Sequence, residues 1–296
     1  MNKELEKPPF EMEPEKELQE KELLNKVTQD ILRLHREIKY KEKRGKNVDK
    51  GREYSVLKKE LIEKHPGEAE NIGLLFGVKR LTEIEKDLED KEKRRKMPKE
   101  VFVELVSWQQ RIAKLLLKKD KEVCESFWKG FTLVFRDFYD SPEWRARFRG
   151  NQNGIIGQVG VYKTLEHFNL RPEFSLPQED ALEQTDLYCT LGKEPVQTKY
   201  SSWVSKPLIA TTDEVNFPSP TIEQEGVKTY IAAKEIEQMT RFKTTCDKMA
   251  KIEGKKVRGL YIAAPWGSFD ETTGKPSQKF LAQAEPELKR HFELVN

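Results

Sequence analysis

The feature that most constrains the fold is the density of charge in the first 100 residues. Half of these residues are charged, with 26 Lys and Arg and 24 Asp and Glu, against 55 charged residues in the remaining 196. So charged a segment can fold only as helices that bury narrow apolar stripes. We therefore expect a helical front part and a compact rear part, for which 296 residues suffice.

Composition and helix-breaking residues divide the chain further. Prolines near the start predict a disordered tail, and Met97-Pro98 is a boundary because proline is tolerated only in the first turn of a helix. The predicted segments are a tail over 1–16, a charged helical and partly coiled-coil region over 17–97, connecting helices over 98–149 and an α/β domain over 150–296.

The front part carries a short apolar seam with spacings of three and four residues: Leu24, Val27, Ile31, Leu34 and Ile38. This spacing is typical of the a and d positions of a coiled coil. Two interpretations remain open. The seam either forms a homodimer through the N-terminal helices or closes an intramolecular helical hairpin.

A hairpin is predicted over Thr185–Lys199, with a turn at Gly192-Lys193 between two short strands. Side chains alternate along a strand, so Gln197 and Lys199 share one face. With the turn centred there, Asp186 lies opposite Lys199 and diagonal to Gln197. A carboxylate, an amide oxygen and an ammonium group on one face suit a hard cation and phosphodiester hydrolysis. An ordinary surface hairpin is the alternative.

This Asp…Gln-x-Lys pattern resembles the signature of the PD-(D/E)xK nuclease superfamily in its D…QxK variant, over roughly residues 150–264. The resemblance implies an α/β fold with a restriction-endonuclease-like mixed sheet flanked by helices. It also implies that Asp186, Gln197 and the carbonyl of Thr198 hold Mg²⁺ or Mn²⁺. Lys199 would orient or deprotonate the attacking water.

The segment 153–168 is predicted to be a helix whose apolar arc contains two polar residues, Gln158 and Glu166. In the superfamily this helix commonly supplies a carboxylate to the metal. Here Gln158 occupies the usual place, and Glu166, two turns later, is a substitute. Their alternative roles are a hydrogen-bonded boundary residue and a solvated helix-end charge. A crossover helix over 229–251 and a buried strand over 257–264, parallel to its neighbour, complete the expected order.

A basic helix, Trp144 to Arg149, precedes this region. Arg145, Arg147 and Arg149 beside two aromatic residues predict contacts with a phosphate backbone. Solvated arginines at a domain boundary are the alternative. Because the net charge is only +3, nucleic-acid binding would have to come from such local clusters.

The sequence thus predicts a metal-dependent nuclease that acts on nucleic acid, DNA in the first place or RNA. The alternative is a non-catalytic helical scaffold with a degenerate nuclease-like domain that binds protein or nucleic acid. No GxxxxGK[ST], GxGxxG, HExxH or GxSxG motif offers competing chemistry.

Three cysteines without paired spacing, Cys124, Cys189 and Cys246, predict reduced thiols. No stretch reaches the roughly 20 apolar residues of a membrane span, and residues 1–30 lack a signal-peptide core. We therefore expect a cytoplasmic protein without membrane contact.

Overall fold

The structure is a computed structural model of the chain. It describes residues 14–183, 185–189, 194–201, 204, 206–212, 221–224, 227–230 and 233–292. These fall into two compact units, one from Met1–Thr82 with Lys119–Ser141 and the other from Glu83–Lys118 with Pro142–Asn296. Residues 98–149 are thus divided between the units, unlike the predicted connecting segment. Of the predicted tail, residues 1–13 lie outside the described residues, whereas 14–16 begin a helix.

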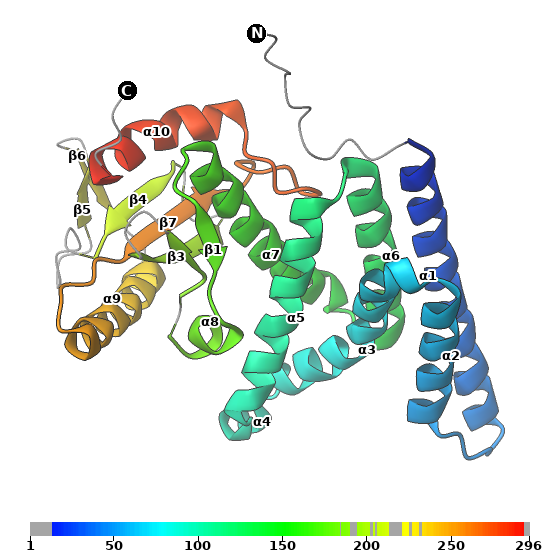
Figure 1. Cartoon of the computed structure of the whole chain (residues 1–296). Helices are drawn as coiled ribbons and strands as arrows, with labels where there is room; N and C mark the ends of the chain where they lie inside the picture. Colours follow the sequence, from blue (N-terminus) through cyan, green and yellow to red (C-terminus); the bar gives the residue numbers. More distant parts are fainter. Residues whose placement is uncertain are drawn as a thin grey trace, which may run out of the picture. The chain divides into compact units, whose positions relative to one another are not determined.

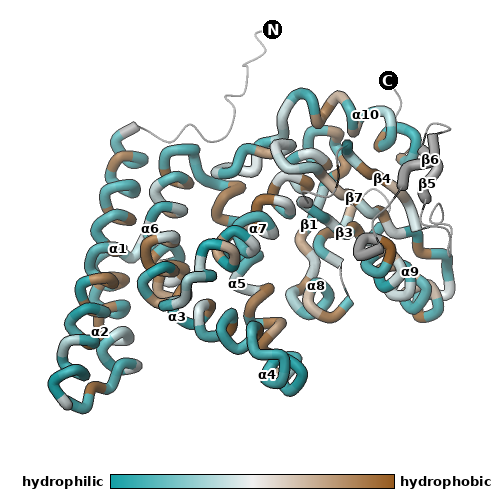
Figure 2. The backbone as a smooth tube through the Cα atoms, turned by 180° about the vertical axis from the view of Figure 1, so that it is seen from behind, coloured by the Kyte–Doolittle hydropathy of each residue, from teal (hydrophilic) through white to brown (hydrophobic). Residues whose placement is uncertain are grey.

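The first unit is helical (Figure 1). Its elements are α1 (Pro14–Lys43), α2 (Lys50–Lys64), the 3₁₀ turn η1 (Pro66–Glu68), most of α3 (Ala69–Glu89) and α6 (Lys121–Tyr139). Helix α1 packs along α6 and α2, although both α1 and α2 are mostly hydrophilic along the backbone (Figure 2). Their few apolar residues therefore supply the packing.

The seam of α1 is used inside this unit. Leu24, Val27, Ile31 and Ile38 are at most 2% exposed. On α6, Phe131 and Phe135 are buried, and Phe135 stacks on Tyr139 with ring centroids 5.1 Å apart. The intramolecular interpretation of the seam therefore accounts for its burial. An association of two copies through these helices would have to use other surfaces.

The second unit is built around a mixed sheet with strand order β1-β2-β3-β7-β4. Its strands are β1 (Pro172–Phe174), β2 (Leu187–Cys189), β3 (Glu194–Ser201), β4 (Leu208–Thr211) and β7 (Leu260–Pro265). Neighbouring strands are antiparallel except for β3 and β7, which are parallel. The α/β class predicted from the sequence agrees with this architecture. A separate ribbon pairs β5 (Thr221–Gln224) with β6 (Val227–Tyr230).

The other described helices of this unit are α4 (Lys91–Lys96), α5 (Lys99–Lys118), α7 (Trp144–His167), α8 (Pro177–Glu183), α9 (Ala233–Glu253) and α10 (Gln278–Phe292). Helix α4 is hydrophilic throughout (Figure 2). The expected crossover helix is α9, and it starts later than predicted because residues 227–230 pair as a strand. Strand β7 is the apolar centre of the sheet, with Leu260 to Ala264 all buried.

Helix α7 joins two predicted segments in one helix. The basic stretch from Trp144 continues without a break through Gly150 into the predicted site helix. A glycine in a helix costs only about 1 kcal/mol relative to alanine, so it does not by itself end one. The helix approaches β3 closely at Gly157, where a Cβ atom would lie 2.7 Å from Cβ of Tyr200. This contact fixes which residues of α7 face the sheet.

Among the described residues, no helix is long and apolar enough to cross a membrane. Cys124, Cys189 and Cys246 are all buried and free of disulfide bonds.

Candidate functional site

Asp186 lies directly before β2 and is held firmly in place. Its backbone N–H donates to the carbonyl of Val196 at 3.0 Å. Its side-chain Oδ2 accepts from the backbone N–H of Thr198 at 2.6 Å and from Thr198 Oγ1 at 3.0 Å. The side chain is 8% exposed. The carboxylate is therefore fixed against β3 by two donors of one residue.

Asp186 belongs to a buried polar group, which we call the acidic cluster: Gln110, Gln158, Asp180, Asp186 and Thr198. Gln158 Nε2, on α7, donates to Asp180 Oδ2 at 3.0 Å and to Asp186 Oδ1 at 3.2 Å. Gln110 Nε2, on α5, donates to the same Asp180 oxygen at 3.0 Å. Three helices and two strands thus bring two carboxyl groups together.

The pKa values of the two carboxyl groups are both raised. The pKa of Asp180 is raised to about 8, first by burial and then by the charge of Asp186, although hydrogen bonds from Gln110 and Gln158 act in the opposite direction. Burial also raises the pKa of Asp186, whereas hydrogen bonds from Thr198, Gln158 and Asp180 oppose this rise. With its pKa at about 8, Asp180 therefore keeps a proton at neutral pH.

The cluster could hold a divalent cation. Gln158 Oε1 is buried and accepts no hydrogen bond from any residue that the structure describes. Two carboxyl groups and an amide oxygen are ligands that hard cations prefer. In the described part of the chain, no three or more His, Cys, Asp or Glu residues gather as a metal site. A cation here would therefore depend on amide oxygens as well as on Asp180 and Asp186.

The register of the hairpin differs from the prediction. Leu187 pairs with Val196, which places Asp186 beside Gln197 rather than opposite Lys199. The predicted turn at Gly192-Lys193 lies outside the described residues.

The predicted single face for Asp186, Gln197 and Lys199 is wrong. Gln197 lies beside Tyr261 and Lys199 beside Ala263 in the parallel ladder with β7. Tyr261 and Ala263 pack in a core cluster with Met239 of α9, so Gln197 and Lys199 project to the α9 side.

Thr198 and Tyr200 project to the other side, toward α7. Tyr200 meets Gly157 of α7, and Thr198 holds the Asp186 carboxylate. Asp186 lies just before the paired residues of β2, so alternation along the strands does not fix its face. Its carboxylate turns to Thr198, whereas Gln197 and Lys199 point to the other side. Gln197 Oε1 is nevertheless buried, and no described residue donates a hydrogen bond to it.

The two helix residues proposed as metal ligands have different places. Gln158 contacts Asp186, as predicted for the residue at this position. Glu166 is exposed and lines a separate pocket with Tyr162 and Phe174. Eight residues of helix separate it from Gln158, about 12 Å along the axis. The position of Glu166 therefore does not support its predicted role as a substitute metal ligand, because its side chain is exposed in a different pocket.

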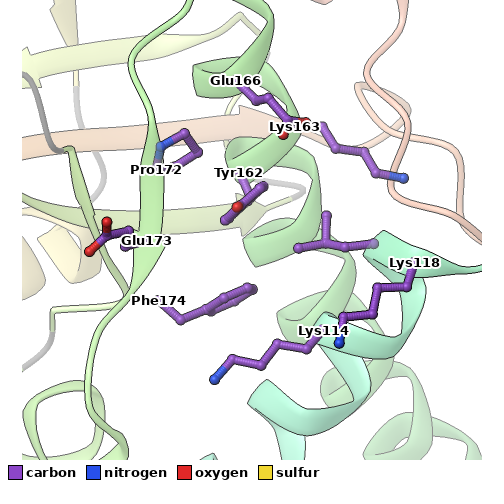
Figure 3. A pocket seen from close by; sticks show the side chains of 9 residues that line it. Lys114, Lys118, Tyr162, Lys163, Glu166, Pro172, Glu173 and Phe174 are labelled. Atoms are coloured by element: carbon purple, nitrogen blue, oxygen red, sulfur yellow. The ribbon is translucent and has the colours of Figure 1, made fainter. Parts of the chain in front are cut away.

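That pocket has a volume of about 420 Å³ and is lined in part by Lys114, Lys118, Tyr162, Glu166 and Phe174. Tyr162 and Phe174 stack with ring centroids 5.3 Å apart, and Lys114 Nζ lies 5.5 Å from the Phe174 ring centre. The pocket lies between α5, the C-terminal half of α7 and β1 (Figure 3).

The three arginines predicted to bind phosphate differ in their surroundings. Arg147 lies within ion-pair distance of Glu85 and Glu89, so its charge is compensated within the unit. Arg145 is exposed, with its guanidinium 5.5 Å from the Trp144 ring centre. Arg149 is exposed too. Only Arg145 and Arg149 therefore offer their charge to a solvent-borne anion.

Sequence reasoning missed Asp180 and Gln110. Asp180 follows Pro177 in a Pro-Gln-Glu-Asp segment, which is a helix-start signal six residues before Asp186. That signal could have predicted α8 and an acidic residue near Asp186. Gln110 gave no signal, since a lone glutamine in an amphipathic helix is an ordinary boundary residue.

Comparisons with known proteins add no identification. No protein family model, no curated protein and no solved structure matches this chain.

Proposed function

We propose that the second unit is a divalent-metal-dependent hydrolase of phosphodiester bonds in nucleic acid, DNA or RNA. The observation that carries the proposal is the pair of a half-buried Asp180 and a buried Asp186, joined by the amide of Gln158. Two carboxyls that cannot both ionise alone can do so around a cation, whose charge reverses the local balance.

The order of elements supports the proposal. Helix α7, the antiparallel strands β1, β2 and β3, helix α9 and the parallel strand β7 follow one another along the chain. This order is similar to the core of the PD-(D/E)xK nucleases. The Asp186 position before β2 and the Gln-x-Lys run on β3 are also similar to the superfamily signature.

The residues take roles that follow from their positions. Asp186 and Asp180 would hold Mg²⁺ or Mn²⁺, and Gln158 would turn its amide to offer Oε1. When bound, such an ion polarises the phosphoryl oxygen and lowers the pKa of a bound water. Thr198 keeps the Asp186 carboxylate in place through its N–H and hydroxyl groups.

Gln197 and Lys199 lie on the α9 side of β3. We therefore assign them a smaller role in catalysis than the superfamily signature implies. We expect removal of the Lys199 ammonium to affect cutting less than neutralisation of Asp186. The carbonyl of Thr198 remains a proposed additional ligand.

The test is an assay for cutting of plasmid, single-stranded DNA and RNA with Mg²⁺ or Mn²⁺. We expect Asp186→Asn and Asp180→Asn to abolish cutting at unchanged fold, measured by circular dichroism. Glu183→Gln is the matched control, because Glu183 is an exposed carboxylate on the same helix as Asp180. Equal cutting by all four proteins would contradict the proposal.

A second candidate function is a non-catalytic nucleic-acid-binding module, and one observation favours it. Both Asp186 oxygens already accept hydrogen bonds, from Thr198 and from Gln158, and Gln158 stands where the superfamily commonly has a carboxylate. Binding of labelled DNA or RNA without any cutting in either cation would select this function.

A further inference from the structure

The pocket beside β1 is lined by aromatic rings and by lysines, and the proposed reaction uses neither. We call this pocket, lined by Lys114, Lys118, Tyr162, Glu166 and Phe174, the ring pocket. All its residues belong to the second unit. Its volume of about 420 Å³ falls in the range of small-ligand sites.

The two rings offer a stacking surface. Tyr162 and Phe174 lie nearly parallel, with an interplanar angle of 17°, and both side chains are only partly buried. Part of this aromatic surface therefore faces the open pocket. Planar bases stack on such rings with little dependence on sequence.

Three lysines and two glutamates line the ring pocket, since Lys163 and Glu173 line it as well. Lys163 Nζ donates to the carbonyl of Thr273 at 2.8 Å, which leaves Lys114 and Lys118 as the two lysines considered for an anion.

Lys114 and Lys118 are exposed and four residues apart on α5, so both ammonium groups lie on one side of the helix. Figure 3 shows these lysines on the Phe174 side, whereas Glu166 lies beyond Tyr162. An anion is therefore favoured at the lysine side, and hydrogen-bond donors of a base or sugar are favoured near Glu166.

The ring pocket also lies close to the acidic cluster. Tyr162 follows Gln158 by four residues on α7, about one helical turn. Phe174 pairs with Leu187, the residue after Asp186, and Ser175 donates to the Asp186 carbonyl. The ring pocket and the acidic cluster are therefore built from the same helix and from neighbouring strands.

We infer that the ring pocket binds one unpaired nucleotide of a single-stranded nucleic acid. Its base stacks on the Tyr162–Phe174 pair, and its phosphate lies between Lys114 and Lys118. In a duplex, both faces of each base are covered by neighbours, so the rings select unstacked bases. This preference for single strands adds a substrate class to the proposed function. The binding itself does not depend on the nuclease proposal, whereas cutting of the bound strand does.

The test is fluorescence anisotropy of the full chain with a labelled oligothymidylate and with a duplex of the same length, in EDTA. Without a cation no cutting occurs, so a failed nuclease proposal would leave this measurement unaffected. We expect Tyr162→Leu to weaken single-strand binding about tenfold, within the effect of losing one aromatic partner. Phe174→Leu should act in the same direction.

The lysine pair gives a second variant that cannot disturb the core. Lys114→Gln with Lys118→Gln should lower the salt dependence of single-strand binding by roughly 0.7 in slope, as expected for the loss of one neutralised phosphate. Lys248→Gln with Lys251→Gln is the control, because it removes two exposed lysines from α9 instead.

Three results would overturn the inference. They are wild-type affinity in both ring variants, a lysine double variant that behaves as the α9 control does, and duplex binding as tight as single-strand binding.

Discussion

At the residue scale, the proposed chemistry depends on Asp180 and Asp186, and burial raises the pKa of both carboxyl groups. Asp186 has its oxygens satisfied by Thr198 and Gln158, and Asp180 keeps a proton because its pKa is raised to about 8. A carboxyl group whose folded pKa lies above its unfolded value binds more protons in the native state. Its contribution to stability is full below the unfolded value near 4 and is lost as the pH rises toward 8.

This sign gives a prediction for Asp180→Asn. The substitution should flatten the fall in the free energy of unfolding between about pH 4 and pH 8, and at pH 8 the variant should be more stable than the wild type. The gain should be at least about 1 kcal/mol, the equivalent of one pKa unit. Urea unfolding at several pH values measures it. Identical pH profiles for the two proteins would show that Asp180 ionises normally.

At the element scale, the position of the cluster depends on how α7 meets β3. The helix is predicted from its apolar arc, and the antiparallel hairpin from its turn and strand residues. Neither pattern predicts which residues of β2 and β3 pair, or which face of the sheet each β3 residue occupies. Those depend on long-range contacts, among them Gly157 against Tyr200 and the β7 ladder. The sequence therefore predicted Asp186 and Gln158 as neighbours, but it misplaced Gln197, Lys199 and Glu166.

The contact at Gly157 can be tested against a glycine of the same helix. Gly157→Ala should destabilise the protein by about 1–3 kcal/mol, because the new methyl group forces the backbone of α7 or β3 to shift. Gly154→Ala has no atom within 4 Å of the new Cβ and should stabilise by up to about 1 kcal/mol. Denaturant unfolding measures both. Equal effects at the two positions would mean that α7 does not approach β3 as described.

The seam of α1 gives a second prediction at this scale. Ile31→Ala should lower the free energy of unfolding by about 2–5 kcal/mol, because Ile31 is 1% exposed in the core of its unit. Val56→Ala, at a side chain 48% exposed, should have little effect. Light scattering should give the same mass for both variants. A change of mass with unchanged monomer stability would instead place the seam between two copies.

At the scale of the whole molecule, the sequence predicted the class of each part better than the limits between them. The contrast in charge predicted a helical part and an α/β part, and the structure has a helical unit and a unit with a mixed sheet. The chain, however, leaves the first unit within α3 and returns to it with α6. Local composition does not show where the chain leaves and re-enters the first unit. Helices α5 and α6 are both amphipathic, but they have different packing partners.

The central claim is that Asp180 and Asp186 form a site for a divalent cation. Because Asp180 keeps a proton at neutral pH, cation binding should release that proton. Calorimetric titration of the full chain with Mn²⁺ at pH 7, in buffers of different ionisation enthalpy, measures this release directly. The account predicts binding with release of close to one proton, lost in Asp186→Asn and retained in Glu183→Gln. Binding without proton release, or the same binding in Asp186→Asn, would contradict it.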